Sequence, residues 1–185
     1  DCVGAIQLLP EQQTPDGIHQ IQGKRLDEAG VERVLKAVVH TPALGQRTDD
    51  ADLRISIAGA QEKTALLRHR GHWHIPSNAT PSTHIFKLPL GLIGNGDIDF
   101  STSVENEWLC AQILSAYEIP VAACKIERFG DQKALVVERF DRRLSSDKSW
   151  WIRLPQEDFC QALGVSPLQK YEADGGPGIS RILDV

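Results

Sequence analysis

The chain has 185 residues, enough for one domain of ordinary size with its own hydrophobic core. Apolar residues make up 41% of it and charged residues 24%, proportions that are typical of a soluble globular protein. The net charge of −5 gives no overall electrostatic reason to bind nucleic acid, and no apolar run approaches the roughly 18 residues of a membrane span.

The cysteines and histidines give only weak signals. With no C-x-x-C motif and no secretory signal, we expect four buried free thiols in a reducing, cytoplasmic compartment: Cys2, Cys110, Cys124 and Cys160. His72 and His74 alternate near His69 and could hold a metal ion. Exposed histidines beside a hairpin turn are the commoner case, so we expect no metal in this chain.

The first 52 residues contain one clear helical pattern. Ala5 to Leu9 is predicted to be a strand, and the stretch from Pro10 to Gly23 a loop. Asp27 is expected to cap a helix that runs to about Val39. Apolar residues at helical spacing would form its buried stripe: Val31, Val34, Leu35 and Val38. Residues 41–52 are predicted to be a linker.

The next stretch, LRISIAGAQEKTALL at residues 53–67, is predicted to be a strand, a small-residue loop and a second strand. Apolar residues alternate with polar ones before the loop, as in a half-buried strand. Ala58 to Ala60 offers almost no side chain, so backbone N–H groups could approach a ligand closely. Beside Lys63, the loop is a candidate phosphate-binding site. A plain β-hairpin is the alternative that these residues alone leave open.

This loop matches neither of two known phosphate-binding motifs. A P-loop needs a second glycine before its lysine and a helix after it, but here Glu62 replaces the glycine and a strand follows. The glycine-rich loop of protein kinases lies between two strands, as here, but carries more than the one glycine of this loop. A P-loop NTPase is therefore disfavoured.

Three strand signals follow the loop. Leu66 to Arg68 and Trp73 to Ile75 are predicted to form a hairpin around Arg70-Gly71, and His84 to Leu88 is the next strand. Lys87 is the one charged residue inside that apolar strand and lies on the same face as an apolar neighbour. It would project into a cleft or, alternatively, protect an edge strand from aggregation.

A helix is predicted from Thr102 to about Tyr117, with Thr102 and Glu105 forming a capping box. Apolar residues cover most of its circumference, and Glu107 falls among them rather than on the polar face. An inward-pointing carboxylate needs a partner, because burying it unpaired is costly. We expect that partner to be Lys87, unless Glu107 lies at the rim and bends out to water.

The remaining elements are predicted from turn residues and apolar runs. They are a loop at Pro89 to Phe100, a hairpin of Pro120 to Glu127 with Lys133 to Phe140, a strand at Trp150 to Leu154, a helix from Pro155 to Leu163, and a glycine-rich loop at Lys170 to Gly178.

The order of these elements is that of a protein-kinase N-lobe: strand, loop, strand, strand, strand with a lysine, helix with an inward glutamate, strand, strand. In that fold the loop covers the nucleotide phosphates, and the lysine, held by the glutamate, reaches them. The segment after the last strand receives the adenine. We therefore predict an α+β fold, with an antiparallel sheet and a helix forming a kinase-like N-lobe, followed by the start of a helical C-lobe.

Six segments in sequence order support this prediction: ISIAGAQEKTALL, THIFKLP, SVENEWLC, ALVVERFDRR, RLPQEDFCQALG and KYEADGGPGI. Together they strongly resemble the HipA-type serine/threonine kinase toxins of bacterial toxin–antitoxin modules. The resemblance extends over nearly the whole chain, from Val3 to Arg181.

The resemblance implies an ATP site. The loop backbone would wrap the phosphates, through Ala58, Gly59, Ala60, Gln61, Glu62 and Lys63. Lys87 would contact the α- and β-phosphates, with Glu107 as its ion-pair partner. A hinge of Glu138, Arg139 and Phe140 would hold adenine through backbone hydrogen bonds and packing of the Phe140 ring.

The resemblance also implies a regulated toxin. Ser56 matches the serine that the family autophosphorylates, which switches the kinase off. A phosphate of about −2 charge there could not coexist with ATP phosphates. The family uses ATP and Mg²⁺ to phosphorylate glutamyl-tRNA synthetase, which arrests translation and growth and gives drug tolerance (persistence). A HipB-like antitoxin restrains it, and the complex binds operator DNA.

We expect the chain to be the middle of a longer protein, because Asp1 is not a methionine and the last helix stops after one turn. Residues 1–48 would link to a missing N-terminal subdomain, 49–140 would form the N-lobe, and 141–185 the hinge and the start of a truncated C-lobe. The family's catalytic base and Mg²⁺ ligands would lie beyond Val185. We therefore expect kinase activity only in the intact protein. The alternative is a truncated, non-catalytic antitoxin-binding module.

Overall fold

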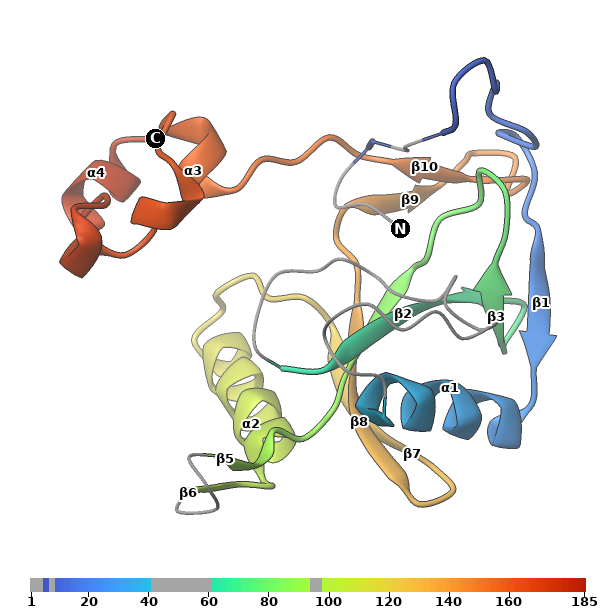
Figure 1. Cartoon of the computed structure of the whole chain (residues 1–185), viewed down its shortest axis with the longest axis horizontal. Coiled ribbons are helices and arrows are strands. Elements are labelled where there is room, and N and C mark those ends of the chain that lie inside the picture. Colours follow the sequence, from blue (N-terminus) through green and yellow to red (C-terminus); the bar gives the residue numbers. More distant parts are fainter. Residues whose placement is uncertain (1–4, 7–8, 41–60, 94–97) are drawn as a thin grey trace.

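The computed structural model describes residues 5–6, 9–40, 61–93 and 98–185 (Figure 1). Within these residues, six strands form one antiparallel sheet in the order β1-β3-β2-β4-β8-β7. The strands are β1 (Gly23–Leu26), β2 (Lys63–His69), β3 (His72–Pro76), β4 (His84–Lys87), β7 (Cys124–Phe129) and β8 (Gln132–Glu138). The predicted α+β class with an antiparallel sheet is confirmed.

Helices and two smaller hairpins complete the described part of the chain. The helices are α1 (Glu28–His40), α2 (Ser103–Ala116), α3 (Phe159–Ala162) and α4 (Ile179–Leu183), with 3₁₀ turns η2 (Pro167–Gln169) and η3 (Glu172–Asp174). The smaller hairpins pair β5 (Gly91–Ile93) with β6 (Ile98–Phe100), and β9 (Arg142–Leu144) with β10 (Trp151–Arg153). No helix in the described ranges combines the length and apolar character needed to cross a membrane.

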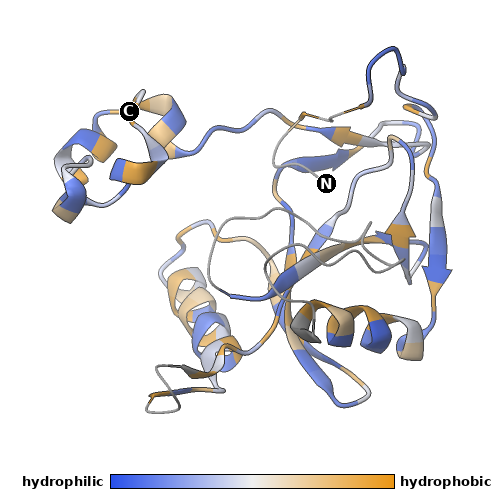
Figure 2. Ribbon diagram, in the orientation of Figure 1, coloured by the Kyte–Doolittle hydropathy of each residue, from blue (hydrophilic) through white to orange (hydrophobic). Residues whose placement is uncertain are grey.

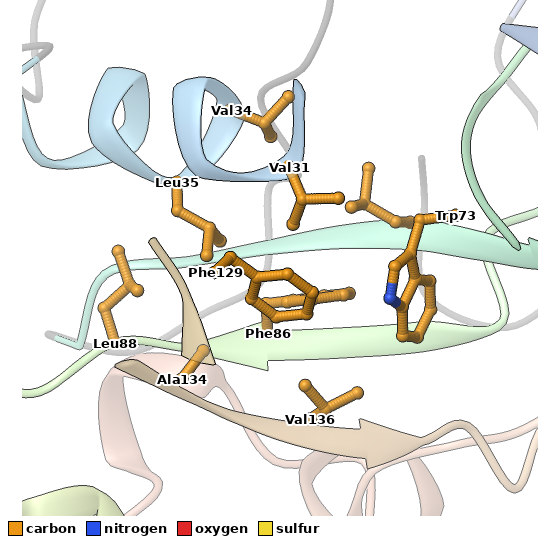
Figure 3. Close-up of a cluster of buried hydrophobic side chains, with 10 residues drawn as sticks. Val31, Val34, Leu35, Trp73, Phe86, Leu88, Phe129, Ala134 and Val136 are labelled. Carbon is orange, nitrogen blue, oxygen red and sulfur yellow. The ribbon is translucent and has the colours of Figure 1, made fainter. Parts of the chain in front are cut away.

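Helix α1 packs against one face of the sheet and forms the core with it (Figure 3). The Oδ1 atom of Asp27 accepts a 2.7 Å hydrogen bond from the Gly30 N–H, which is the predicted cap. The predicted stripe is buried against the sheet through Val31 and Leu35, both fully buried, and Val34. Each such side chain contributes roughly 1.5–3 kcal/mol by leaving water.

An aromatic cluster on the sheet receives this stripe. The ring of Phe86 is fully buried and lies 4.9 Å from the ring centroid of Trp73 and 5.8 Å from that of Phe129. Both contacts are tilted rather than stacked, as aromatic quadrupoles prefer. Three strands thus contribute one ring each to the surface that α1 covers (Figure 3).

The strand register separates two faces of the sheet. Thr64, Phe86 and Val136 are direct cross-strand neighbours, and Phe86 and Val136 belong to the α1 core. Because side chains alternate along a strand, the adjacent residues lie on the opposite face. That face carries Lys63 and Lys87, which are also direct neighbours. The sequence therefore gives one face to the core and places two lysines on the other.

The two predicted hairpins of the sheet are present with the turns expected for them. Arg70 and Gly71 have φ values of 49° and 80° between β2 and β3, and Gly130 has φ 57° between β7 and β8. Positive φ values in two-residue turns match the twist of antiparallel strands. Strand β4 also lies where the apolar run predicted it.

Several short strands differ from the predictions. Ala5, Ile6 and Leu9 belong to no strand, so the predicted N-terminal strand is wrong at its described positions. The sequence predicts no strand at β1, and the loop predicted before it ends at Gly23. Strand β1 has no apolar alternation, because it is an edge strand paired only with β3 and three of its four residues are exposed. Hairpin β5–β6 and strand β9 consist of three-residue strands, too short to show a period.

Helix α2 begins directly after Thr102 as predicted, but the predicted capping box of α2 and the predicted start of α3 are wrong. The Thr102 side chain makes no capping hydrogen bond, since its backbone (φ −99°, ψ 14°) is outside the extended region that a cap requires. Glu105 instead pairs with Lys133. The helix expected from Pro155 begins only at Phe159, because Asp158 and Gln161 form a reciprocal capping box there.

The described cysteines are free but not buried as predicted. Cys110 is exposed, and Cys124 and Cys160 are half-buried. Cys110 is exposed because it lies on α2, whose described residues are mostly exposed. Cys2 lies outside the described residues.

The chain leaves the sheet after β8 through a buried ionic network. Arg139 and Arg142 both donate to the Asp141 carboxylate, with N–O distances of 2.8–2.9 Å, and all three side chains are almost fully buried. Arg139 also donates to Ser82 Oγ at 3.1 Å. The Leu154 N–H donates to the Asp141 carbonyl at 2.9 Å, so β9–β10 is joined to the same point. Beyond it, α3 and α4 lie away from the sheet (Figure 1).

Candidate functional site

An ion pair between Lys87 and Glu107 lies on the sheet face opposite α1. Lys87 is the last residue of β4, and its Nζ donates to the Oε1 of Glu107 in the second turn of α2. Both side chains are partly buried, with 28% and 38% of their surface exposed. The lysine and the inward glutamate that the sequence singled out are thus brought together by the strand register and the helix.

Lys63 brings a second positive charge to the same place. It is the cross-strand partner of Lys87, so the two ammonium-bearing side chains share one face. Burial, followed by the positive charge of Lys87, lowers the pKa of Lys63. The carboxylates of Glu107 and Glu62 act on Lys63 as well. Two ammonium groups on neighbouring strands are nevertheless placed to meet an anionic ligand such as a phosphate together.

The end of the predicted phosphate loop is tied to β4. The Leu88 N–H donates to the Glu62 carbonyl at 3.0 Å, and the Gln61 Nε2 donates to the Leu88 carbonyl at 2.8 Å. The Gln61 side chain is therefore used to hold the chain just before β2. The rest of the predicted loop, Ala58, Gly59 and Ala60, lies outside the described residues, and so does Ser56.

The predicted adenine hinge follows β8. The N–H groups of Glu138 and Arg139 donate to the carbonyls of Ala123 and Thr83, at 2.8 and 2.9 Å. The Arg139 guanidinium is buried on Asp141, so neither its side chain nor its N–H faces a ligand. The Phe140 ring is 74% exposed. Of the hinge side chains, Phe140 therefore has the exposed apolar surface that a base could cover.

The strand register places four further residues on this face, which the sequence alone does not single out. Ala65, Ile85, Val137 and Cys124 are successive cross-strand neighbours over four strands, in the row next to Lys63 and Lys87. Burial, and next the Glu107 carboxylate, raise the pKa of the Cys124 thiol. Only the pairing of β7 with β8 reveals this placement, and no sequence motif carries it.

The described residues contain no group of three or more histidine, cysteine or acidic side chains placed to hold a metal ion. His69 and His74 face each other with ring centroids 6.0 Å apart, and His72 contacts Arg25.

Known proteins share these sequence features. Residues 55–185 match the family model described as the HipA-like C-terminal domain. Y4mE of Sinorhizobium fredii, named as a candidate kinase, is 38% identical over 180 residues, which are 96% of this chain and 40% of Y4mE. The serine/threonine-protein kinase toxin HipA of Shewanella oneidensis is 29% identical over 178 residues, 96% of this chain and 38% of that protein.

A solved structure has the same fold. In the complex of HipA, HipB and operator DNA from Shewanella oneidensis, one chain superposes with a TM-score of 0.66 and 28% sequence identity. The match covers 99% of this chain and 39% of that one. This chain spans about 40% of the length of the relatives it matches. On the match of residues 55–185, the chain belongs to the HipA-like C-terminal domain family.

Proposed function

We propose that the protein containing this chain is an ATP-dependent serine/threonine kinase toxin of a bacterial toxin–antitoxin module. The observation that carries the proposal is the Lys87–Glu107 ion pair beside Lys63, on the sheet face opposite α1. The relatives named as kinases, and the family match, support the same reaction class.

In this proposal the two lysines bind the nucleotide phosphates. Two cations on neighbouring strands fit a polyphosphate better than a neutral ligand, and Glu107 holds the Lys87 ammonium in a fixed place. Residues 58–63 would add backbone N–H groups over the phosphates. The exposed Phe140 ring would pack on the adenine. Hydrogen bonds to the base would come from hinge backbone groups other than the N–H groups of Glu138 and Arg139, which pair within the fold.

Phosphoryl transfer also needs groups that we place outside the described site. Mg²⁺ would neutralise charge on the phosphates, held by residues beyond Val185, and the base that accepts the substrate hydroxyl proton would lie there too. This chain would supply binding and orientation, so by itself it is expected to be inactive.

The substrate and partners are proposed from the family resemblance. The substrate would be glutamyl-tRNA synthetase, whose phosphorylation arrests translation and growth. A HipB-like antitoxin would restrain the kinase and bring it to operator DNA, as the solved complex of HipA, HipB and DNA supports. Autophosphorylation at Ser56 would switch the kinase off. The free thiols of the described cysteines agree with a cytoplasmic location.

Replacing Lys87 tests the proposed function. In the complete gene product, Lys87→Ala should lower phosphate transfer from ATP to glutamyl-tRNA synthetase by about 100-fold or more, because one preorganised phosphate contact is lost. Transfer of labelled phosphate and the dissociation constant of an ATP analogue are the measurements.

Lys36→Ala is the matched control. Lys36 forms a 2.6 Å ion pair with Glu32 on α1, on the other side of the sheet, so its loss should leave transfer unchanged. Equal phosphate transfer by the wild type and Lys87→Ala would overturn the assignment. Transfer that depends on Lys87 but spares glutamyl-tRNA synthetase would retain the kinase and overturn the substrate.

A further inference from the structure

Helix α2 carries Glu107, yet it has few apolar contacts with the sheet. Among the described residues of α2, Val104 alone is buried. The apolar side chains further along the helix are exposed: Trp108, Leu109, Ile113 and Leu114. Figure 2 shows apolar and polar bands alternating along the helix. Burial of one valine is a weak constraint on the orientation of a fourteen-residue helix.

Polar contacts provide the missing constraint at the start of α2. Lys133, on β8, forms a 2.5 Å ion pair with Glu105, and its Nζ also lies 3.5 Å from the Ser101 carbonyl. The Leu90 N–H donates to Ser103 Oγ at 3.0 Å. Lys133 is the most buried of these charged groups, with 18% of its side chain exposed, so it has little freedom to move.

Lys133 and Lys87 act on the same side of the sheet. Leu135 is the cross-strand partner of Lys87, and Lys133 lies two residues before it on β8, so all three share one face. Their partners, Glu105 and Glu107, are two residues apart on α2. The described structure therefore joins α2 to two adjacent strands by two ion pairs, about 3 Å apart along the helix axis.

We infer that Lys133 is a positioning residue: through Glu105 it holds the first turns of α2 where Glu107 can meet Lys87. This inference rests on the proposed function, because it concerns the ion pair that would hold the phosphate-binding lysine. Without Lys133, Val104 and the Leu90–Ser103 hydrogen bond still hold the start of α2, but the first turn has more freedom to rotate. A rotation of the first turn displaces Glu107, which is on the next turn of the same rigid helix.

The experiment compares single and double variants of the complete gene product. Lys133→Gln should lower kcat/KM for ATP about fivefold, the upper end of what a partly exposed ion pair contributes when it acts on a barrier. Lys133→Arg should restore most of it, because it keeps the charge at the same place. Lys36→Gln, which removes the α1 ion pair on the other face, should leave it unchanged.

The decisive measurement uses a Glu107→Gln background. If Lys133 acts through Glu107, Lys133→Gln has no further effect once Glu107 has lost its charge. A merely structural lysine would give the same fivefold loss in both backgrounds, and that additivity would overturn the inference. A Lys133→Gln variant as active as the wild type would also overturn it.

Two further comparisons distinguish a failure of the proposed function from a failure of this inference alone. If Lys87→Ala is as active as the wild type, the proposed function fails, and the inference fails with it. If Lys87→Ala is impaired while Lys133→Gln is not, the inference alone fails. Should Lys133→Gln not fold, Glu105→Gln removes the same ion pair from the exposed side and is judged by the same criteria.

Discussion

His84 shows how one side chain in the sheet can make stability depend on pH. Its ring packs edge-on against Trp73 with centroids 5.0 Å apart, and its Nδ1 lies 2.8 Å from Thr83 Oγ1. Burial, together with the positive charges of Arg68 and Lys125, lowers the pKa of His84 from 6.5 to about 4. The ring is therefore neutral at pH 7 in the folded protein.

We expect His84 to reduce stability in mild acid. Between pH 6.5 and about 4 the unfolded chain protonates at this residue and the folded chain does not, so the unfolded state binds more protons. The free energy of unfolding should therefore fall as pH falls through this window. In His84→Gln the fall should be shallower, as urea unfolding at pH 7.5, 6 and 5 would show.

His72→Gln is the control for this prediction, because His72 is exposed at the neighbouring hairpin turn. Its unfolding free energy should follow the wild-type pH dependence. An identical pH dependence in His84→Gln and the wild type would show that the buried imidazole is not responsible.

The sequence predicts residues well when their type conflicts with their surroundings. Lys87 in an apolar strand and Glu107 in an apolar helical arc were both conspicuous, and the structure joins them. Lys133 and Cys124 were not conspicuous, because each occupies an ordinary position in its own strand. Their placement follows from the register of β8 with β4 and β7, which no local pattern specifies.

At the scale of elements, α1 and the β7–β8 turn support each other. The carboxylates of Glu28 and Glu32 accept hydrogen bonds from the N–H groups of Gly130 and Asp131, both at 3.3 Å. Gly130 has φ 57°, and a Cβ there would overlap the Glu32 carboxylate. Glycine suits the left-handed backbone angle here, and a Cβ would also force the end of the Glu32 side chain to shift.

Gly130→Ala should destabilise the protein by about 1–2 kcal/mol for the left-handed backbone, with a further loss for displacing Glu32. Gly71→Ala provides the matched comparison. Gly71 has φ 80°, and a Cβ there would meet nothing within 4 Å, so only the backbone cost applies. Urea unfolding should rank wild type, Gly71→Ala and Gly130→Ala in falling order of stability.

Glu32→Ala in the Gly130→Ala background should recover part of the loss, because it removes the overlapping carboxylate. Equal destabilisation by the two glycine substitutions would contradict the proposed role of α1 in fixing this turn.

Elements with a periodic apolar pattern over many residues, or with clear turn residues, could be predicted from the sequence. Short polar elements could not. Helix α1 has an apolar stripe and a capping aspartate, and the β2–β3 and β7–β8 hairpins have apolar arms around turn residues. Strand β1 has only four residues with no alternation, and its pairing with β3 depends on a tertiary contact. Helix α3 was placed too early, since Pro155 was a weaker start signal than the Asp158 capping box.

For the whole molecule, the fold class followed from the order of elements, because antiparallel hairpins interrupted by one helix permit few arrangements. The two faces of the sheet could also be anticipated from strand alternation. The exposed apolar side chains of α2 could not, since an apolar helical pattern predicts burial and does not say which surface provides it.

Regulation at Ser56 is a prediction at this scale, because it concerns two states of the complete protein. During incubation with ATP, the wild-type gene product should become phosphorylated at Ser56 and lose kinase activity, since a phosphate of about −2 charge repels those of ATP. Ser56→Ala should remain active. Phosphopeptide mass spectrometry and phosphate transfer over time would be compared, and parallel inactivation of both proteins would contradict the switch.

The buried network of Arg139, Asp141 and Arg142 has a mechanical consequence. It ties the chain after β8 to Ser82, and the Leu154 hydrogen bond ties the far end of β9–β10 to the same aspartate. A domain boundary between residues 140 and 141 would lie inside this network, because Arg139 precedes that point and Asp141 and Arg142 follow it. We therefore expect any swing of α3 and α4 relative to the sheet to occur after Leu154, at residues 155–158, and to leave the Phe140 backbone in place.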